Sequence, residues 1–284
     1  MRITTVIIGV LALSLLSLAC PRASQTDTAA GDAVNLQAPD ARDATAIIPN
    51  APSAAPFDGE SRFLRTADGY LVASWYWPPA GEQAPGVILL HMRGRDKSSW
   101  GDMPEKLVAE GFAVIAIDLR GHGETLDPQG RRMQLEQLKN ADYLAMLGDV
   151  AAAHQALSDD ARVDGDRVGI IGASIGANLA IMYAAGDKRV RTAVALSPGL
   201  NYMGLEPLGY LEGYDARALY LIAAEGDETA FESCEALEKA TAADPVSFRH
   251  FEGRDHGTDL LTAHPGLDMT IISGWLLNHL PPQR

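Results

Sequence analysis

Short apolar runs without polar alternation recur along this chain, and segments with helical patterning lie between them. A strand with one solvent-exposed face alternates apolar and polar residues, whereas a run that is apolar at every position predicts a strand buried on both faces. Such strands occur in mostly parallel sheets that carry helices on both faces. The runs lie at residues 87–90, 114–117, 168–171, 190–196 and 218–224. The pattern therefore predicts an α/β fold with a mostly parallel central sheet.

The remaining segments complete this succession of strands and helices. Residues 63–66 and 70–77 predict a hairpin, because the Asp68-Gly69 pair between them favours a tight turn. Residues 247–251 predict the last strand. Helices are expected after a cap at Ser98 or Ser99 and up to Gly111, at 136–157, at 175–185 before Gly186, at 231–241, and around Leu267, Ile271, Trp275 and Leu276 before Pro281-Pro282.

The first sixty residues carry targeting signals rather than a core-forming pattern. The apolar run 6–19 follows Met1-Arg2 and is shorter than the roughly 20 residues that span a bilayer, which is typical of a secretory signal. It ends in Ser17-Leu18-Ala19-Cys20, which resembles the lipobox of bacterial lipoproteins, although Ser17 stands where Leu is usual. This resemblance implies a signal peptide at 1–19, removed before a Cys20 that becomes lipidated.

Residues 20–60 predict a tether. They are rich in Ala, Asp, Pro, Ser and Thr and show no helical or strand period, so a flexible segment is expected between Cys20 and a folded domain at 61–284. Acyl chains on Cys20 would hold the exported protein on a membrane surface. The expected location is the outer side of the cytoplasmic membrane, the periplasm or the outer membrane.

Charge and cysteine usage exclude several classes of function. The formal net charge of −14 argues against nucleic acid as a partner, because phosphate backbones attract clustered Lys and Arg. The chain has two cysteines, Cys20 and Cys234, and neither has metal-ligand spacing. No nucleotide-binding or metal motif is present, so neither a cofactor nor a metal is expected.

The pentad 172–176 has the pattern Gly-x-Ser-x-Gly, with Ser174 at its centre. It follows the apolar run 168–171 and opens the helix expected from Ile175, the context in which a sharp strand-to-helix turn exposes a serine hydroxyl. Ser174 is therefore the candidate nucleophile. The amide of Ile175, at the helix N-terminus, can donate to an oxyanion. A Gly-rich turn with a solvated serine is the alternative interpretation.

A serine nucleophile needs a general base and a carboxylate that orients the base. His256 is the candidate base, because it lies in the loop after the last predicted strand, and His264 is its main rival. Asp227 is the candidate acid, because it comes just past the strand at 218–224. The rival carboxylates are Glu225, Glu228 and Asp255. His154 lies in a predicted helix and is expected at the surface.

Together with these three residues, two further motifs resemble the α/β-hydrolase superfamily over residues 62–280. His91-Met92-Arg93 stands where members carry His-Gly-x, whose backbone completes the oxyanion hole, and the sequence leaves open whether Met92 or Arg93 donates. The segment 118–124 matches the Asp-x-Arg-Gly-x-Gly turn, which is expected to be architectural. Lidless esterases of the dienelactone-hydrolase kind are similar, but they use Cys where this chain has Ser174.

The connection 197–217 is too short to form a lid domain. An open site is therefore expected, with Tyr202 and Met203 contacting substrate, together with Leu200 and Tyr210, unless these residues only pack on the sheet edge. The resemblance implies a carboxylesterase acting on a small ester. Transfer to other acceptors, thioesterase or peptidase activity, and a non-catalytic binding role on the same fold are the alternatives. The oligomeric state is not readable from the sequence.

Overall fold

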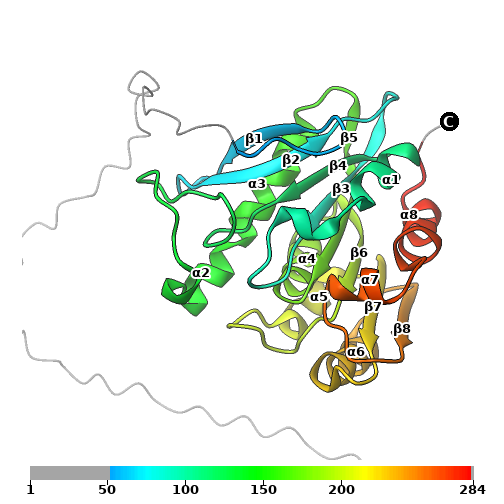
Figure 1. Ribbon diagram of the computed structural model, residues 1–284. Helices are drawn as coiled ribbons and strands as arrows, with labels where there is room; N and C mark the ends of the chain where they lie inside the picture. Colours follow the sequence, from blue (N-terminus) through cyan, green and yellow to red (C-terminus); the bar gives the residue numbers. More distant parts are fainter. Residues whose placement is uncertain (1–51, 283–284) are drawn as a thin grey trace, which may run out of the picture. The chain divides into compact units, whose positions relative to one another are not determined.

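A computed structural model describes residues 52–282 of the 284-residue chain, and Figure 1 shows how their strands and helices are arranged. The expected signal peptide 1–19, the lipidation site Cys20 and most of the expected tether lie outside the described residues. Within residues 52–282, no helix is both long enough and apolar enough to cross a membrane.

The strands form one eight-stranded sheet in the order β1-β2-β4-β3-β5-β6-β7-β8. The strands from β3 to β8 run parallel, whereas β2 pairs antiparallel with both β1 and β4 at one edge. Their bounds are β1 Glu60–Arg65, β2 Leu71–Trp77, β3 Ala84–Leu90, β4 Ala113–Ile117, β5 Val163–Ala173, β6 Val190–Leu196, β7 Ala218–Ala224 and β8 Val246–Phe251. The predicted fold class is confirmed, and each predicted strand is present.

Both faces of this sheet are covered, as the unalternating apolar runs predict. The buried residues form two hydrophobic clusters. In β3, Ile88 and Leu90 belong to the first and Val87 and Leu89 to the second, and all four are fully buried. Residues of α3 (Leu147–Ser158), α4 (Ile175–Gly186) and α6 (Glu228–Ala240) belong to the first cluster. Residues of α1 (Met103–Ala109) and α8 (Gly274–His279) belong to the second.

The helix predicted at 136–157 is broken into a 3₁₀ turn η2 (Leu135–Gln137), α2 (Asn140–Ala145) and α3. The break follows from a tertiary contact. Leu138 is extended, with ψ 135°, and its side chain lies so close to Gly121 that a β-carbon on that glycine would clash with it. Packing against the 118–124 turn thus overrides the local preference of this segment for a continuous helix.

Two further helix predictions are corrected. Neither Ser98 nor Ser99 caps α1, which begins after Asp102; both lie in a separate 3₁₀ turn, η1 (Lys97–Trp100). Asp96 caps that turn, because its side chain accepts a hydrogen bond from the Ser98 amide at 2.8 Å. The last helix begins as a π-helix, η4 (Leu267–Ser273), before α8. The remaining short elements are η3 (Pro207–Tyr210), α5 (Leu211–Tyr214) and α7 (Asp259–Ala263).

Residues 53–60 fall within the expected tether, yet they contact the folded domain. The Trp75 indole donates to the Ser53 carbonyl at 2.8 Å, and the Trp77 indole donates to the Pro56 carbonyl at 2.9 Å. The Ser53 amide and hydroxyl both donate to the carboxylate of Glu124. The folded unit therefore begins before residue 61.

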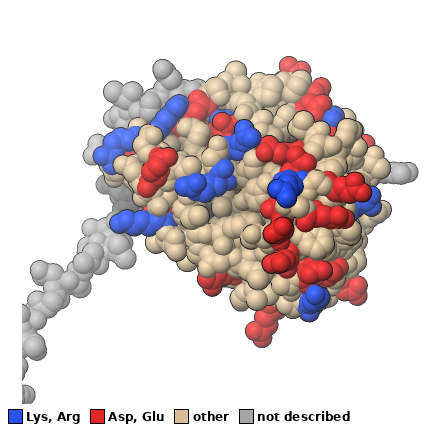
Figure 2. All heavy atoms as spheres, turned by 60° about the horizontal axis from the view of Figure 1, so that its bottom comes forward, with Lys and Arg blue, Asp and Glu red and all other residues tan. Residues whose placement is uncertain are grey.

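The surface of the described residues carries charges of both signs. Figure 2 shows one face of the molecule, on which Lys and Arg side chains lie mainly toward the left and Asp and Glu side chains mainly toward the right. The exclusion of nucleic acid as a partner stays a prediction from the net charge.

The turn at 118–124 joins separate loops through buried charges. Asp118 is fully buried and accepts hydrogen bonds from the Lys97 amide and ammonium, both at 2.8 Å. Arg120 is also buried and binds Asp149 of α3 and Asp68 of the β1–β2 turn. These contacts confirm the architectural role expected for this turn.

We expect Lys97→Met to lower the free energy of unfolding by about 3–5 kcal/mol, because it leaves the Asp118 carboxylate buried without its cation. Urea unfolding at pH 7 measures the loss. Glu124→Gln is the matched control, because Glu124 pairs with the same ammonium but is partly exposed, and about 1 kcal/mol or less is expected there. Equal losses in the two variants would contradict the buried-pair account.

Candidate active site

Ser174 occupies the turn between β5 and α4, and its backbone is strained there. It has φ 54° and ψ −115°, outside the regions that non-glycine residues favour. The neighbouring glycines permit this turn. A β-carbon on Gly172 would collide with the Gly176 carbonyl, and one on Gly176 would collide with the Leu90 carbonyl of β3. The turn thus needs both glycines of the pentad, which supports the elbow predicted from the sequence.

Neighbouring strands hold Ser174 in place. Its amide donates to the Leu196 carbonyl at the end of β6, at 2.8 Å, and the residue is only 7% exposed. Ile175 is the first residue of α4, so its amide points out of the helix N-terminus. Within the described residues, no protein acceptor pairs with this amide, which leaves it available to an oxyanion.

His256 and Asp227 are directly paired. The His256 Nδ1 lies 2.6 Å from Asp227 Oδ2, with Asp227 at the start of α6 and His256 in the loop after β8. Because a carboxylate only accepts, Nδ1 carries the proton and Nε2 presents a lone pair. The Asp227 side chain is 15% exposed and that of His256 36%, so the pair is open to solvent on the imidazole side. This is the geometry of an oriented general base.

Backbone contacts bring the His256 loop beside Ser174. The amide of Gly257 donates to Ser197 Oγ at 3.0 Å, and Ser197 directly follows the strand residue that holds the Ser174 amide. A β-carbon on Gly257 would lie 3.4 Å from the β-carbon of Ala173 and 2.6 Å from Met92 Sδ. The Ser174 hydroxyl and the His256 ring form no hydrogen bond between themselves in this structure, and such bonds often tighten only when substrate binds.

Two of the rival residues, Glu225 and His264, have other partners. His250 pairs with Glu225 at 2.8 Å, but both side chains are about half exposed, at 52% and 51%. The His264 ring packs on Phe251, with ring centroids 4.5 Å apart. His154, which was expected at the surface, is instead buried between α3 and α4, where it contacts the Tyr183 hydroxyl and the Gly165 carbonyl.

The loop after β3 is fixed by a buried histidine. The Leu119 amide donates to His91 Nε2 at 3.0 Å, and Nδ1 then donates to the Met92 carbonyl at 2.8 Å. Among the described residues, the amides of Met92 and Arg93 have no protein acceptor, so either one can face an oxyanion. The Arg93 side chain is exposed and donates to the Tyr143 hydroxyl at 2.9 Å.

Tyr202 packs edge-on against His256, with ring centroids 6.2 Å apart, whereas Met203 is exposed to solvent. Their turn is held to the nucleophile's own helix, because the fully buried Asn178 side chain accepts from the Gly199 amide and donates to the Gly199 and Leu205 carbonyls. The connection 197–217 forms only short turns and the four-residue elements η3 and α5, so the described residues contain no lid domain there.

Sequence reasoning missed two supporting residues, Ser197 and Asn178. Ser197 is buried and has φ 50°, and its hydroxyl positions the backbone next to His256. A polar residue directly after a buried parallel strand was the signal that could have singled it out. Asn178 lies one turn beyond Ser174 in a helix whose neighbouring positions are apolar, and an amide in such a place must find buried partners.

Burial of the two histidines beside this loop makes stability depend on pH. Burial lowers the pKa of His91 to about 4, and burial together with the nearby His91 lowers the pKa of His122 to about 4. The unfolded chain binds these protons near pH 6.5. Between about pH 6.5 and 4 the unfolded state therefore holds more protons, so the free energy of unfolding should fall as the pH falls.

We expect His91 alone to account for a loss of about 3 kcal/mol across this window, with no further loss from it below pH 4. Urea unfolding at pH 7 and at pH 4.5 measures the effect. His122→Gln should show a smaller pH dependence than the unmodified protein. An unfolding free energy that stays constant between pH 7 and 4.5 would contradict the account.

Comparison with known proteins places the chain in a family. Residues 71–259 match the dienelactone hydrolase family. A 2-hydroxy-6-oxononadienedioate/2-hydroxy-6-oxononatrienedioate hydrolase of Pseudomonas putida is 32% identical over 143 residues, which are 49% of this chain and 45% of that protein. An uncharacterised Mycobacterium tuberculosis protein is 28% identical over 138 residues, 48% of this chain and 44% of that protein. The chain thus spans less than half the length of these curated relatives.

Solved structures show the same fold. An esterase from Pyrococcus furiosus superposes with a TM-score of 0.63 at 20% identity, covering 79% of this chain and 92% of that one. Acetyl xylan esterase 1 from Thermoanaerobacterium superposes with a TM-score of 0.62 at 17% identity, covering 82% and 86%. The family match spans most of the sheet and includes Ser174, Asp227 and His256. The chain is therefore an α/β-hydrolase that belongs to the dienelactone hydrolase family.

Proposed function

We propose that the protein is a serine hydrolase that cleaves small carboxylic esters through an acyl-enzyme on Ser174. One observation carries the proposal: a strained serine at the β5–α4 turn stands beside a histidine whose Nδ1 is held by a carboxylate at 2.6 Å. A serine hydroxyl is activated by an oriented imidazole that takes its proton, and the sharp turn exposes that hydroxyl. Family membership adds support for hydrolysis, although the family's usual nucleophile is Cys.

In the proposed mechanism, Ser174 Oγ attacks the ester carbonyl while His256 Nε2 takes its proton. The carbonyl oxygen becomes an oxyanion, which accepts hydrogen bonds from the Ile175 amide and from the amide of Met92 or Arg93. Each such donor typically contributes about 3 kcal/mol to the transition state. His256 then returns the proton to the leaving alcohol. Water attacks the acyl-enzyme by the same route, releasing the acid and regenerating the hydroxyl.

Burst kinetics test the covalent step. Mixing the protein with p-nitrophenyl acetate should release close to one p-nitrophenolate per active site rapidly, followed by slower turnover limited by deacylation. Added methanol should then divert acetyl groups to methyl acetate. Preferential transfer to methanol over water would favour the acyltransferase alternative, and cleavage of peptides but not esters would favour a peptidase. Absence of any turnover or burst would contradict the proposal.

We also propose that the protein is exported and anchored to a membrane through lipidated Cys20. The support is the sequence of residues 1–20 alone. Mass spectrometry of the protein extracted from membranes of a bacterial host should find a mature N-terminus at Cys20 with acyl chains attached. Cys20→Ser should abolish the modification. An unmodified chain that begins at Met1 would contradict this proposal.

A further inference from the structure

The imidazole of His256 is held by a single hydrogen bond. Its Nδ1 lies 2.6 Å from Asp227 Oδ2, and among the described residues the ring has no other hydrogen-bond partner. The side chain is 36% exposed, so burial does not fix the ring either. One hydrogen bond anchors one atom and leaves the ring free to swing about it. A general base must keep Nε2 within reach of the hydroxyl that it deprotonates, so a second contact is needed.

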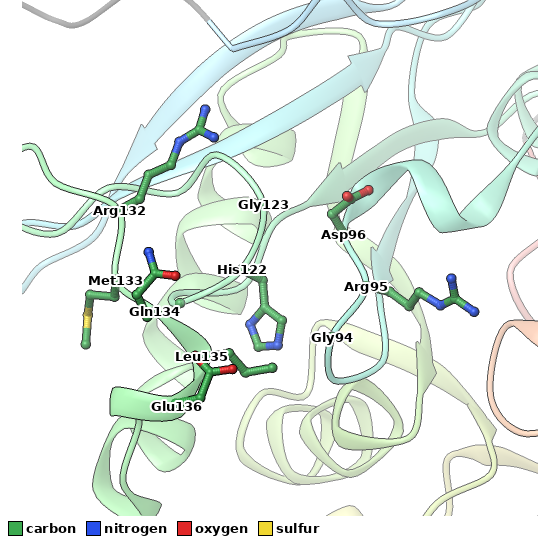
Figure 3. Close-up of a pocket in the computed structure, with 11 residues that line it drawn as sticks. Gly94, Arg95, Asp96, His122, Gly123, Arg132, Met133, Gln134, Leu135 and Glu136 are labelled. Carbon is green, nitrogen blue, oxygen red and sulfur yellow. The ribbon is translucent and has the colours of Figure 1, made fainter.

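Two buried histidines of the same domain are fixed more firmly. Both ring nitrogens of His91 form hydrogen bonds with backbone groups. His122 has one hydrogen bond, but the residue is only 6% exposed, and Figure 3 shows its ring between the segments 94–96 and 132–136. His256 has neither a second hydrogen bond nor full burial. The contact that fixes its ring therefore has to come from a neighbouring side chain.

Tyr202 supplies a contact of this kind. Its ring packs edge-on against the imidazole of His256, with centroids 6.2 Å apart and ring planes at 72°. Aromatic pairs in this arrangement attract each other beyond the effect of the area that they bury. Burial raises the pKa of the Tyr202 hydroxyl, and the negative charge of Asp227 raises it further. The tyrosine therefore lies beside both members of the histidine–aspartate pair.

A tight turn places Tyr202 against the base. Tyr202 and Leu205 exchange backbone hydrogen bonds of 3.1 and 2.9 Å. The two residues between them, Met203 and Gly204, have φ values of 55° and 85°. Two successive positive φ values are typical of a type I′ turn, in which a residue such as methionine is rarely found. Backbone strain of this kind persists where the surrounding structure enforces it, and it gathers at functional sites.

The residues before this turn leave room for the ring and fix its position. Gly199 is buried, and a β-carbon on it would lie 2.5 Å from two atoms of the Tyr202 ring. The backbone of Gly199 is bound to α4 through the Asn178 side chain. The next residue, Leu200, donates its amide to the Ser233 hydroxyl of α6 at 3.1 Å. The turn is thus tied to the helix that follows the nucleophile and to the helix that begins next to the acid.

We propose that Tyr202 is a positioning residue for the general base: its ring limits rotation of the His256 imidazole about the hydrogen bond to Asp227 and keeps Nε2 directed toward Ser174. The aromatic ring alone is required, and the tyrosine hydroxyl takes no part in proton transfer. This inference rests on the proposed ester hydrolysis, because it concerns the base of that reaction.

Steady-state kinetics with p-nitrophenyl acetate separate the ring from the hydroxyl. Tyr202→Ala should lower kcat about five- to tenfold, the size expected when one aromatic contact with the base is lost. KM should change little, because acylation and deacylation use the same base. Tyr202→Phe retains the ring and should keep kcat within about twofold of the unmodified protein. Gly199→Ala keeps the tyrosine but displaces its ring, and should lower kcat as Tyr202→Ala does.

Proton NMR follows the base without any substrate. The Nδ1 proton of an imidazole paired with a carboxylate resonates far downfield when its exchange with water is slow. The unmodified protein should show such a resonance, and His256→Ala should lose it. A ring that swings freely exposes this proton to water, so the resonance should broaden in Tyr202→Ala and Gly199→Ala and persist in Tyr202→Phe. If the protein hydrolyses no ester, the proposed function fails, while this resonance still decides the role of Tyr202.

Tyr183→Ala is the matched control. Tyr183 also packs edge-on against a histidine, His154, with ring centroids 5.8 Å apart, but that pair lies between α3 and α4. The variant should leave kcat and the His256 resonance unchanged. Urea unfolding checks that each variant is folded, and if Tyr202→Ala does not fold, Gly199→Ala decides between the same outcomes.

Two results would overturn the inference. One is a folded Tyr202→Ala protein that keeps both its kcat and the downfield resonance. The other is a Tyr202→Phe protein as impaired as Tyr202→Ala, because the hydroxyl and not the ring would then be the group that matters.

Discussion

Replacing Ser174 by Ala should abolish ester turnover and leave the protein folded. We expect kcat to fall by about 10⁴- to 10⁶-fold, because the acyl-enzyme cannot form and only binding and oxyanion contacts remain. Stability should change little. The change removes one hydroxyl that has no hydrogen-bond partner among the described residues, and an alanine β-carbon fits wherever a serine β-carbon fits. Initial rates with p-nitrophenyl acetate, together with urea unfolding, measure both expectations.

The matched control for this change is Ser197→Ala, which removes a second buried hydroxyl of the same region. The Ser197 hydroxyl accepts a hydrogen bond from the Gly257 amide but has no role in bond cleavage in the proposed mechanism. The Ser197→Ala variant should retain far more activity than Ser174→Ala. Ester turnover by Ser174→Ala at a rate comparable to that of the unmodified protein would refute the assignment of the nucleophile.

Asp227→Asn should lower kcat by about 10⁴-fold while preserving the fold. The side-chain amide that this change introduces can donate to His256 Nδ1, which favours the tautomer with the proton on Nε2. An imidazole in that state cannot take the proton from Ser174, and the imidazolium that forms during attack loses its carboxylate. Steady-state rates across pH 6 to 9 measure the loss of kcat. At high pH kcat should partly recover, because hydroxide can then take the proton in place of His256.

Glu225→Gln provides the comparison for Asp227→Asn. Glu225 also pairs with a histidine, His250, but both side chains are exposed. We expect less than about a twofold change in kcat, since an exposed pair of this kind contributes little. If Glu225→Gln were as damaging as Asp227→Asn, the acid would have to be reassigned.

Most of the sheet could be predicted from the sequence because its strands are buried on both faces. The bounds predicted for 190–196 and 218–224 match β6 and β7, since each of these runs is bounded by a clear turn. Helices were less predictable where tertiary contacts determine the backbone conformation. Leu138 interrupts the helix expected at 136–157 because it packs on Gly121, and no local pattern records that contact.

The candidate site could likewise be predicted only in part from the sequence. Ser174, Asp227 and His256 could be predicted because each follows a predicted strand, and parallel strands bring their carboxyl ends to one edge. The pairing of His256 with Asp227 rather than with Asp255 or another carboxylate depends on tertiary geometry, as does the burial of His154. Ser197 and Asn178 were not predicted, because each forms hydrogen bonds with the backbone of a loop that is distant in the sequence.

Labelling with a fluorophosphonate probe tests the central claim most directly, because such probes react with activated serines. The purified protein should incorporate one probe molecule, peptide mapping should place it on Ser174, and His256→Ala should lose the label. That result would establish a serine activated by this histidine. A folded protein that takes no label, or one labelled equally in the His256→Ala variant, would contradict the account.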